Sequence, residues 1–168
     1  MTERLYSQSE FNKIFKHISP KTLMHWIFTG VIGWKSETYD GRGRHREFNI
    51  ENLYNCGLVE ELTTIGFPLE IIKAGMITLD ISTPFDLQHR ERHFKLQKIS
   101  ENSDKLFVVW KFVPGRQQWK KGRPFKIDIL RPAELLENLT DIEESCSFSA
   151  INLGKVKARV DTYINQNL

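Results

Sequence analysis

Apolar residues in the first half of the chain recur at helical spacing and are bracketed by residues that begin or end helices. At three positions a polar residue that can cap a helix lies between two apolar residues: Ser7, Ser19 and Asn49. The side-chain oxygen of such a cap accepts hydrogen bonds from unpaired N–H groups of the first turn, and the apolar pair fixes the entry of the chain. The pattern predicts helices over 7–15, 20–29 and 50–65, and a fourth from Pro68.

A tight turn separates the first two predicted helices, and the second of them has two unlike faces. Leu23, Trp26 and Ile27 share one face and are expected to pack inward. The other face carries a lysine beside large side chains: Lys21, Met24, His25 and Phe28. Such a mixture suits a helix that meets base edges and thymine methyl groups in a DNA major groove. The segment therefore reads as a helix-turn-helix unit.

The segment after the second helix predicts a hairpin with a basic tip. A short strand is expected over 31–34 and its return over 44–48, around a loop rich in arginine and glycine. The basic and histidine residues of this loop are Lys35, Arg42, Arg44, His45 and Arg46. One interpretation is a wing that contacts phosphates or enters the minor groove. The other is an ordinary solvated hairpin loop.

The second half of the chain changes to the alternation typical of β-strands. Strands are predicted over 93–99, 106–113, 125–130 and 146–149, with helices over 131–139 and 152–165. The last helix has an apolar stripe made by Leu153, Val156, Val160 and Ile164. This stripe either covers the small sheet or forms half of a two-fold dimer contact.

Together these elements predict an α+β protein of two domains. Residues 1–76 are expected to form an N-terminal winged helix-turn-helix that binds DNA. Residues 77–168 are expected to form a small antiparallel-sheet domain with a C-terminal helix, for dimerisation, sensing or auxiliary DNA contact. The boundary is placed near 75–84, and 168 residues suffice for a real core.

Charge is uneven along the chain, although the net charge is only +3. Between 87 and 126 there are eleven Lys or Arg residues against three acidic ones. Within this stretch, the connection over 114–124 offers a second candidate nucleic-acid contact through Arg116, Trp119, Lys120 and Lys121. Basic side chains supply affinity through counterion release, and Trp119 could stack on a base or ribose. The alternative is a solvated hairpin whose tryptophan folds back on the sheet.

Other function classes receive little support from the sequence. Cys56 and Cys146 are the only cysteines, which indicates a reducing cytoplasm and no disulfide framework, and Cys56 is expected in the core. No apolar run is long enough for a bilayer, and the start does not resemble a secretory signal. Ionisable residues crowd together over 89–93, but no nucleophile–base pattern, phosphate loop or zinc spacing accompanies them. No enzyme activity, metal or cofactor is expected.

The ordered set of motifs in the first two fifths or so of the chain resembles the winged-helix DNA-binding domain of the MerR family of transcriptional regulators. The motifs are Ser19-Pro20-Lys21-Thr22-Leu23, Trp26, Gly30-Val31-Ile32, a Gly/Arg wing ending Arg46-Glu47-Phe48, and Leu62-x-x-x-Gly66-Phe67-Pro68-Leu69-Glu70-Ile71-Ile72. This chain departs from the family by carrying Met24-His25 where Arg-Tyr is common and Phe48 where tyrosine is common. It also lacks a sustained heptad pattern after Lys73.

The resemblance implies a homodimer that binds double-stranded DNA and controls transcription. It implies that the helix from Pro20 reads the major groove and that Arg46 and neighbouring wing residues grip phosphates. The predicted DNA-contacting residues are Ser19, Lys21, Thr22, Met24, His25, Lys35, Arg42, Arg44, His45 and Arg46, with Arg116, Trp119, Lys120 and Lys121 as the auxiliary set.

Two alternatives stay open at this point. The second domain could be a sensor for a small molecule or a partner protein, with a pocket lined by Phe94, Trp110 and Phe112. The chain could instead be an architectural or recombination accessory protein, because winged helices of this general kind also serve phage excision.

Overall fold

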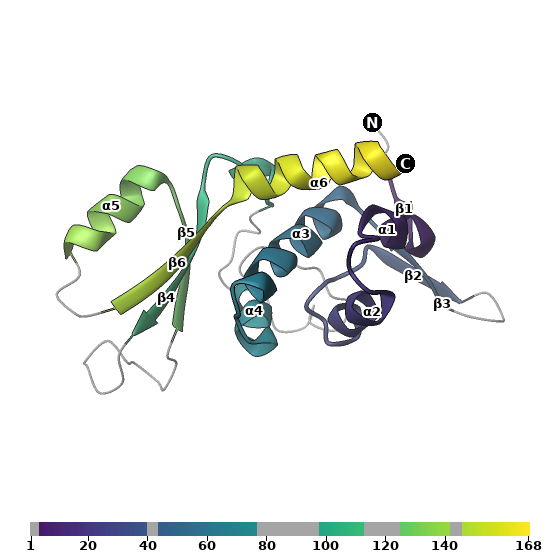
Figure 1. Ribbon diagram of the computed structural model, residues 1–168, viewed down its shortest axis with the longest axis horizontal. Helices are drawn as coiled ribbons and strands as arrows, with labels where there is room; N and C mark the ends of the chain where they lie inside the picture. The colour runs from purple at the N-terminus through teal and green to yellow at the C-terminus, as the bar shows by residue number, and fades with distance from the viewer. Residues whose placement is uncertain (1–3, 40–43, 77–97, 113–124, 142–145) are drawn as a thin grey trace.

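The computed structural model describes residues 4–39, 44–76, 98–112, 125–141 and 146–168. Within these ranges the protein is a mixed α/β structure with six α-helices and two three-stranded antiparallel sheets (Figure 1). In the first half the elements are β1 (Tyr6–Ser7), α1 (Gln8–Ile14), α2 (Pro20–Phe28), β2 (Ser36–Tyr39), β3 (Arg44–Phe48), α3 (Ile50–Thr64) and α4 (Leu69–Met76). In the second half they are the 3₁₀ turn η2 (Ser100–Asn102), β4 (Leu106–Phe112), β5 (Phe125–Leu130), α5 (Pro132–Asp141), β6 (Cys146–Asn152) and α6 (Leu153–Asn167).

The predicted helix caps are confirmed by their hydrogen bonds. Ser7, Ser19 and Asn49 are the N-caps of α1, α2 and α3. Their side-chain oxygens accept hydrogen bonds from the backbone N–H groups of Glu10, Thr22 and Asn52 at 3.2, 3.1 and 3.0 Å, respectively. Each bond satisfies an N–H group that has no partner inside its helix. The starts of these helices are therefore fixed by local chemistry.

The strand predicted over 31–34 is wrong, and the end of α2 explains why. Gly30 adopts a left-handed conformation with φ of 71°. The N–H groups of Val31 and Ile32 then donate to the carbonyl of Trp26 at 2.9 and 3.2 Å. This closure of the helix end uses amides that a strand would need for its ladder. Val31 and Ile32 are buried without being a strand, and the first strand of the hairpin is β2, further along the chain.

The first sheet has the order β1-β3-β2 and packs against α1. Tyr6 pairs with Phe48, and Glu37 and Thr38 pair with Arg46 and His45. The two-residue strand β1, which the sequence pattern did not predict, ties the N-terminal segment to the hairpin. The aromatic rings of Phe11 and Phe48 stack at 4.4 Å between the sheet and α1.

The second sheet has the order β5-β4-β6, so the apolar strand β4 lies in its centre. Phe107 and Val109 face the main core, whereas Val108 and Trp110 face a smaller cluster with Leu135 of α5. Burial on both faces accounts for the continuous apolar run of β4.

The strand predicted over 146–149 is present and longer than expected, because β6 spans Cys146–Asn152. Of the strand predicted over 93–99, residues 93–97 fall outside the described residues and Ile99 lies in a turn, where it is buried.

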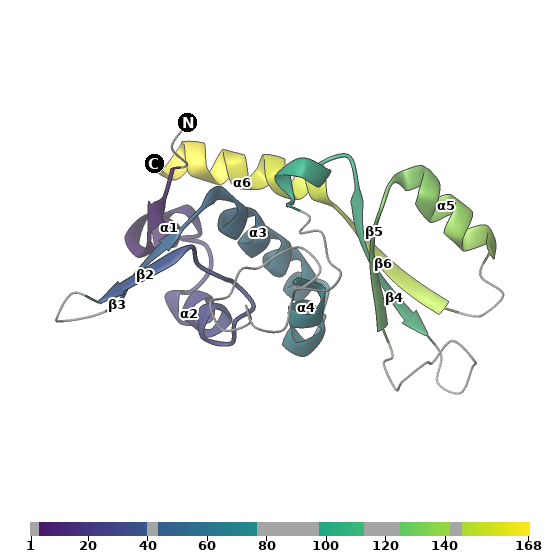
Figure 2. The same ribbon diagram turned by 180° about the vertical axis from the view of Figure 1, so that it is seen from behind.

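The terminal helix α6 packs across α3 and α1, an arrangement that neither sequence-based alternative described (Figures 1 and 2). Leu153, Val156 and Val160 are buried in the same cluster as the cores of α1, α2 and α3. Phe107 of β4 belongs to this cluster too, and a Cβ atom added at Gly75 of α4 would lie 2.7 Å from its ring. One continuous core therefore joins the first half of the chain to the second sheet.

Candidate nucleic-acid interface

Helix α2 lies on the side of the first half of the molecule that faces away from α6 (Figures 1 and 2). Leu23, Trp26 and Ile27 are buried in the main core cluster, as predicted. The outer face of α2 is formed by four side chains one to two turns apart: Lys21, Met24, His25 and Phe28. Lys21 and His25 are exposed and Met24 is half-buried, while Phe28 is 69% exposed. In the described part of the chain, the side chains of Lys21 and His25 make no hydrogen bond or ion pair, while the backbone carbonyl of His25 accepts hydrogen bonds from the N–H and hydroxyl groups of Thr29.

Ser19 and Thr22 hold the start of α2. The Thr22 N–H group donates to the Ser19 hydroxyl at 3.1 Å, and the two side-chain oxygens share a second hydrogen bond at 2.8 Å. Both residues are thus engaged with each other at the first turn. Lys21, between them, projects from the positive end of the helix dipole into solvent, where an anion is stabilised.

Arg46 is the clearest departure from the sequence-based expectation. Its side chain is only 6% exposed, and its Nε atom lies 3.3 Å from the Glu37 carboxylate on the neighbouring strand. The guanidinium carbon lies 5.3 Å from the ring centre of Phe28 and 5.0 Å from that of Trp34. These are cation–π distances. Arg46 is therefore an internal contact between the hairpin and α2, while its contact with phosphate stays a prediction.

A signal for the burial of Arg46 exists in the sequence. Phe48 is a core residue of β3, and alternate residues of a strand share a face. Arg46 lies on the face of Phe48, whereas His45 and Glu47 on the opposite face are exposed. The arginine-rich composition of the loop indicated a solvent-exposed wing, although this alternation indicates that Arg46 is buried.

The structure describes only some of the remaining residues that were predicted to contact DNA. Lys35 is exposed directly before β2, and His45 is exposed on β3. Arg44 begins β3 and pairs with Tyr39 in the backbone register. Arg42 and the auxiliary set, Arg116, Trp119, Lys120 and Lys121, lie outside the described residues.

Lys73 of α4 is a basic residue beside α2 that the sequence reasoning missed. A Cβ atom added at Gly30, at the end of α2, would lie 3.6 Å from the Lys73 Nζ atom. Lys73 is exposed, so its charge is available to solvent. No local pattern links α4 to α2, because the contact depends on the packing of α4 against α3.

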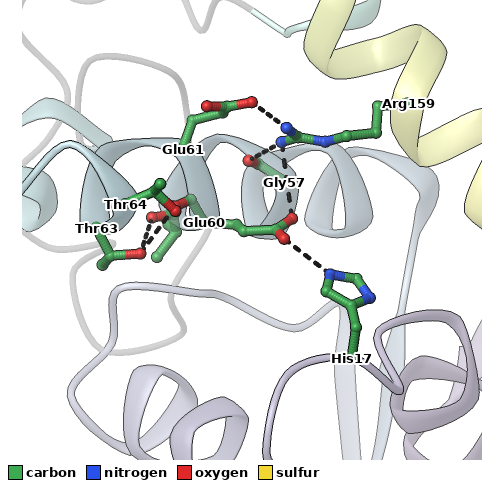
Figure 3. Close-up of polar contacts among 8 residues, drawn as sticks. His17, Gly57, Glu60, Glu61, Thr63, Thr64 and Arg159 are labelled. Carbon is green, nitrogen blue, oxygen red and sulfur yellow. Dashed lines mark hydrogen bonds and ion pairs between the residues drawn. The ribbon is translucent and has the colours of Figure 1, made fainter.

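Ionisable residues also gather where α6 meets α3, but there they bind one another (Figure 3). Arg159 donates to the Gly57 carbonyl at 2.9 Å and forms ion pairs with Glu60 and Glu61. A hydrogen bond of 2.8 Å joins Glu60 to His17. The cluster joins α6 to α3 and to the turn that follows α1, which is a structural role.

Burial sets the pKa of two residues in the same region. It raises the pKa of the Cys56 thiol well above its usual range, and Cys56 is fully buried, as expected for a core residue. Burial is also the main cause of the raised pKa of Tyr54, and the hydrogen bond from its hydroxyl to Asp161 at 2.7 Å adds to the shift. Both groups are held neutral at physiological pH.

Trp110, one of three residues expected to line a sensor pocket, is packed in the small cluster. It is 2% exposed, its indole N–H donates to Asp128 at 2.8 Å, and its ring lies 5.3 Å from Phe148. Phe94 lies outside the described residues, and of Phe112 only the backbone is described. Trp110 serves the core of the sheet.

Two further properties bear on the kind of site that this protein carries. Among the residues that the structure describes, no group of three or more His, Cys, Asp or Glu side chains is arranged to hold a metal ion. Nor does any helix in these ranges combine the length and hydropathy needed to cross a bilayer. In comparisons with protein-family models and with curated protein sequences, nothing matches this chain.

Proposed function

We propose that this protein is a cytoplasmic, DNA-binding transcriptional regulator that acts as a homodimer and resembles the MerR family in its first 76 residues. In this proposal α1 and α2 form the helix-turn-helix, the β2–β3 hairpin is its wing, and the outer face of α2 enters the major groove. The observation that carries the proposal is that Lys21, His25 and Phe28 on this face are exposed, whereas Leu23, Trp26 and Ile27 on the opposite face are buried.

The chemistry of the outer face supports a duplex as the partner. Lys21 offers a charge to phosphate, His25 offers ring nitrogens to base edges, and Met24 and Phe28 offer apolar surface to thymine methyl groups. The exposed lysines Lys35 and Lys73, both of which follow α2 in the sequence, add positive charge. Such a distribution combines base readout with backbone contacts, which sequence-specific DNA binding requires.

The test begins with selection of bound duplexes from a random pool, followed by titration of the selected site. Replacing Lys21 or His25 by alanine is expected to weaken specific binding by about 1–3 kcal/mol. The matched control is Lys155→Ala, which removes an exposed lysine from α6. The proposal is overturned if the wild-type chain binds no duplex, or if the control loses as much affinity as the α2 variants.

The same selected site separates regulation from an architectural role. A regulator changes the amount of transcript from a promoter that carries the site. Strong bending of the duplex without any change in transcript would instead identify an architectural or recombination accessory protein. A palindromic site would support two-fold binding by a homodimer.

A further inference from the structure

We infer that Arg46 is a positioning residue that fixes the β2–β3 hairpin against α2, and that it does so without contacting DNA. This inference rests on the proposed function, because what Arg46 positions is the wing relative to the outer face of α2. It replaces the phosphate contact that the sequence and the family resemblance imply for this arginine.

The contacts of Arg46 join three separate segments of the chain. Phe28 is the last residue of α2, Trp34 lies between α2 and β2, and Glu37 belongs to β2. The guanidinium group is within cation–π distance of both rings, at 5.3 and 5.0 Å, and 3.3 Å from the Glu37 carboxylate. A planar guanidinium can stack on rings with its flat face while the N–H groups in its plane pair with a carboxylate, a geometry that the compact ammonium group of lysine does not reproduce.

The burial and charge of the group argue against a direct role at phosphate. Arg46 is 6% exposed and the Glu37 side chain 18% exposed, so little of the cation reaches the surface. The nearby carboxylate offsets its charge. A phosphate contact would require Arg46 to leave two rings and an ion pair in a partly dry site, which is costly.

The same contacts give the exposed ring of Phe28 a partner within the chain. Phe28 is 69% exposed, and the guanidinium group of Arg46 lies against its ring. The ring is thereby held at the end of α2, and the hairpin is held at a set distance from the helix. A groove and its flanking phosphates have a fixed spacing, so binding to a specific site needs this distance to be constant.

Substitutions of Arg46 separate positioning from phosphate contact by their salt dependence. For Arg46→Ala we expect the affinity for the selected site to fall about tenfold or more, with little change in the salt slope. Arg46→Lys is not expected to restore it. Loss of a phosphate contact would instead lower the slope by about 0.9, and lysine would restore most of the affinity.

Glu37→Gln separates the two roles by the sign of its effect. If Arg46 positions the hairpin, loss of the ion pair loosens it and specific binding weakens. If Arg46 contacts phosphate, the substitution frees a cation and binding strengthens. The control is Glu47→Gln, which removes an equal charge from the exposed face of the same hairpin.

A loss of folded protein is excluded by the ratio of specific to non-specific duplex affinity, since a smaller active fraction lowers both alike. We expect this ratio to fall in Arg46→Ala and in Glu37→Gln, but not in Glu47→Gln. An unchanged ratio in both variants, with a wild-type chain that binds its site, would overturn the positioning role alone. A wild-type chain that binds no duplex would overturn the proposed function and this inference together.

Discussion

Helices α2 and α6 have similar patterns in the sequence but different surroundings in the fold. Both bury one apolar face and carry ionisable and aromatic residues on the rest of their surface. In α6 these residues are used within the chain: Arg159 binds Gly57 and two glutamates of α3, and Asp161 binds Tyr54. In the described part of the chain, the Lys21 and His25 side chains of α2 make no such bonds.

This difference shows that an amphipathic pattern alone does not tell whether the polar side of a helix contacts its own chain or an external partner. A lysine, a histidine or an aromatic residue on the polar side of a helix fits an internal contact as well as an external partner. Only the packing of the rest of the chain separates the two cases. The account therefore depends on α6 being firmly docked and on the outer face of α2 being free.

The largest effect is expected from Gly57→Leu, which tests the docking of α6. A Cβ atom at Gly57 would lie 2.5 Å from the Val160 side chain and 3.3 Å from that of Val156. Overpacking of a close helix contact costs about 1–3 kcal/mol of unfolding free energy. Urea denaturation measures this loss. Ala158→Leu, on the exposed side of α6, is the control and should change stability by less than about 0.5 kcal/mol.

A smaller effect on the same contact is expected from Tyr54→Phe. Removing the hydroxyl breaks the 2.7 Å bond to Asp161 and should cost about 1 kcal/mol. Because the folded-state pKa of Tyr54 is raised, its contribution is complete below the unfolded pKa of about 10 and is lost as pH rises further. Between pH 9 and 11 the melting temperature should therefore fall less steeply with rising pH in the variant than in the wild-type chain. Identical curves would show that the hydroxyl contributes nothing.

The smallest effect is expected on the α2 side, from Lys73→Ala. Loss of one contact with a DNA phosphate should reduce the salt slope of duplex binding by about 0.9. The melting temperature of the protein should stay unchanged. Lys13→Ala removes an exposed lysine from α1 and serves as the comparison. Equal slopes in the two variants would remove Lys73 from the interface.

Local chemistry made much of the fold predictable. The caps at Ser7, Ser19 and Asn49 fixed helix starts to within a residue or two, because an N-cap bond involves neighbours in sequence. Gly66 ends α3 in a left-handed conformation, as expected of a glycine in that position. The continuous apolar run of β4 and the alternation in β5 likewise predicted two strands of the second sheet.

Features that depend on distant contacts could not be predicted in the same way. Val31 and Ile32 have the composition of a strand, but the closure of α2 uses their amides. The partner of α6 is set by the fit of Val160 against Gly57, about a hundred positions apart in the sequence. The candidate site shows the same limit. Helical periodicity predicts the outer face of α2 and strand alternation places Arg46 on the face of Phe48, but the contacts of Arg46 with Phe28 and Trp34 depend on how separate segments pack.

The most direct test of the account is to map amide chemical shifts while a duplex is added to the full chain. We expect the largest changes to fall on α2 and on the β2–β3 hairpin, with Lys21, His25 and Phe28 among them. Amides of α6 and of β4 should change little. A footprint confined to the second sheet and its connections, with α2 unaffected, would contradict the central claim that the outer face of α2 binds DNA.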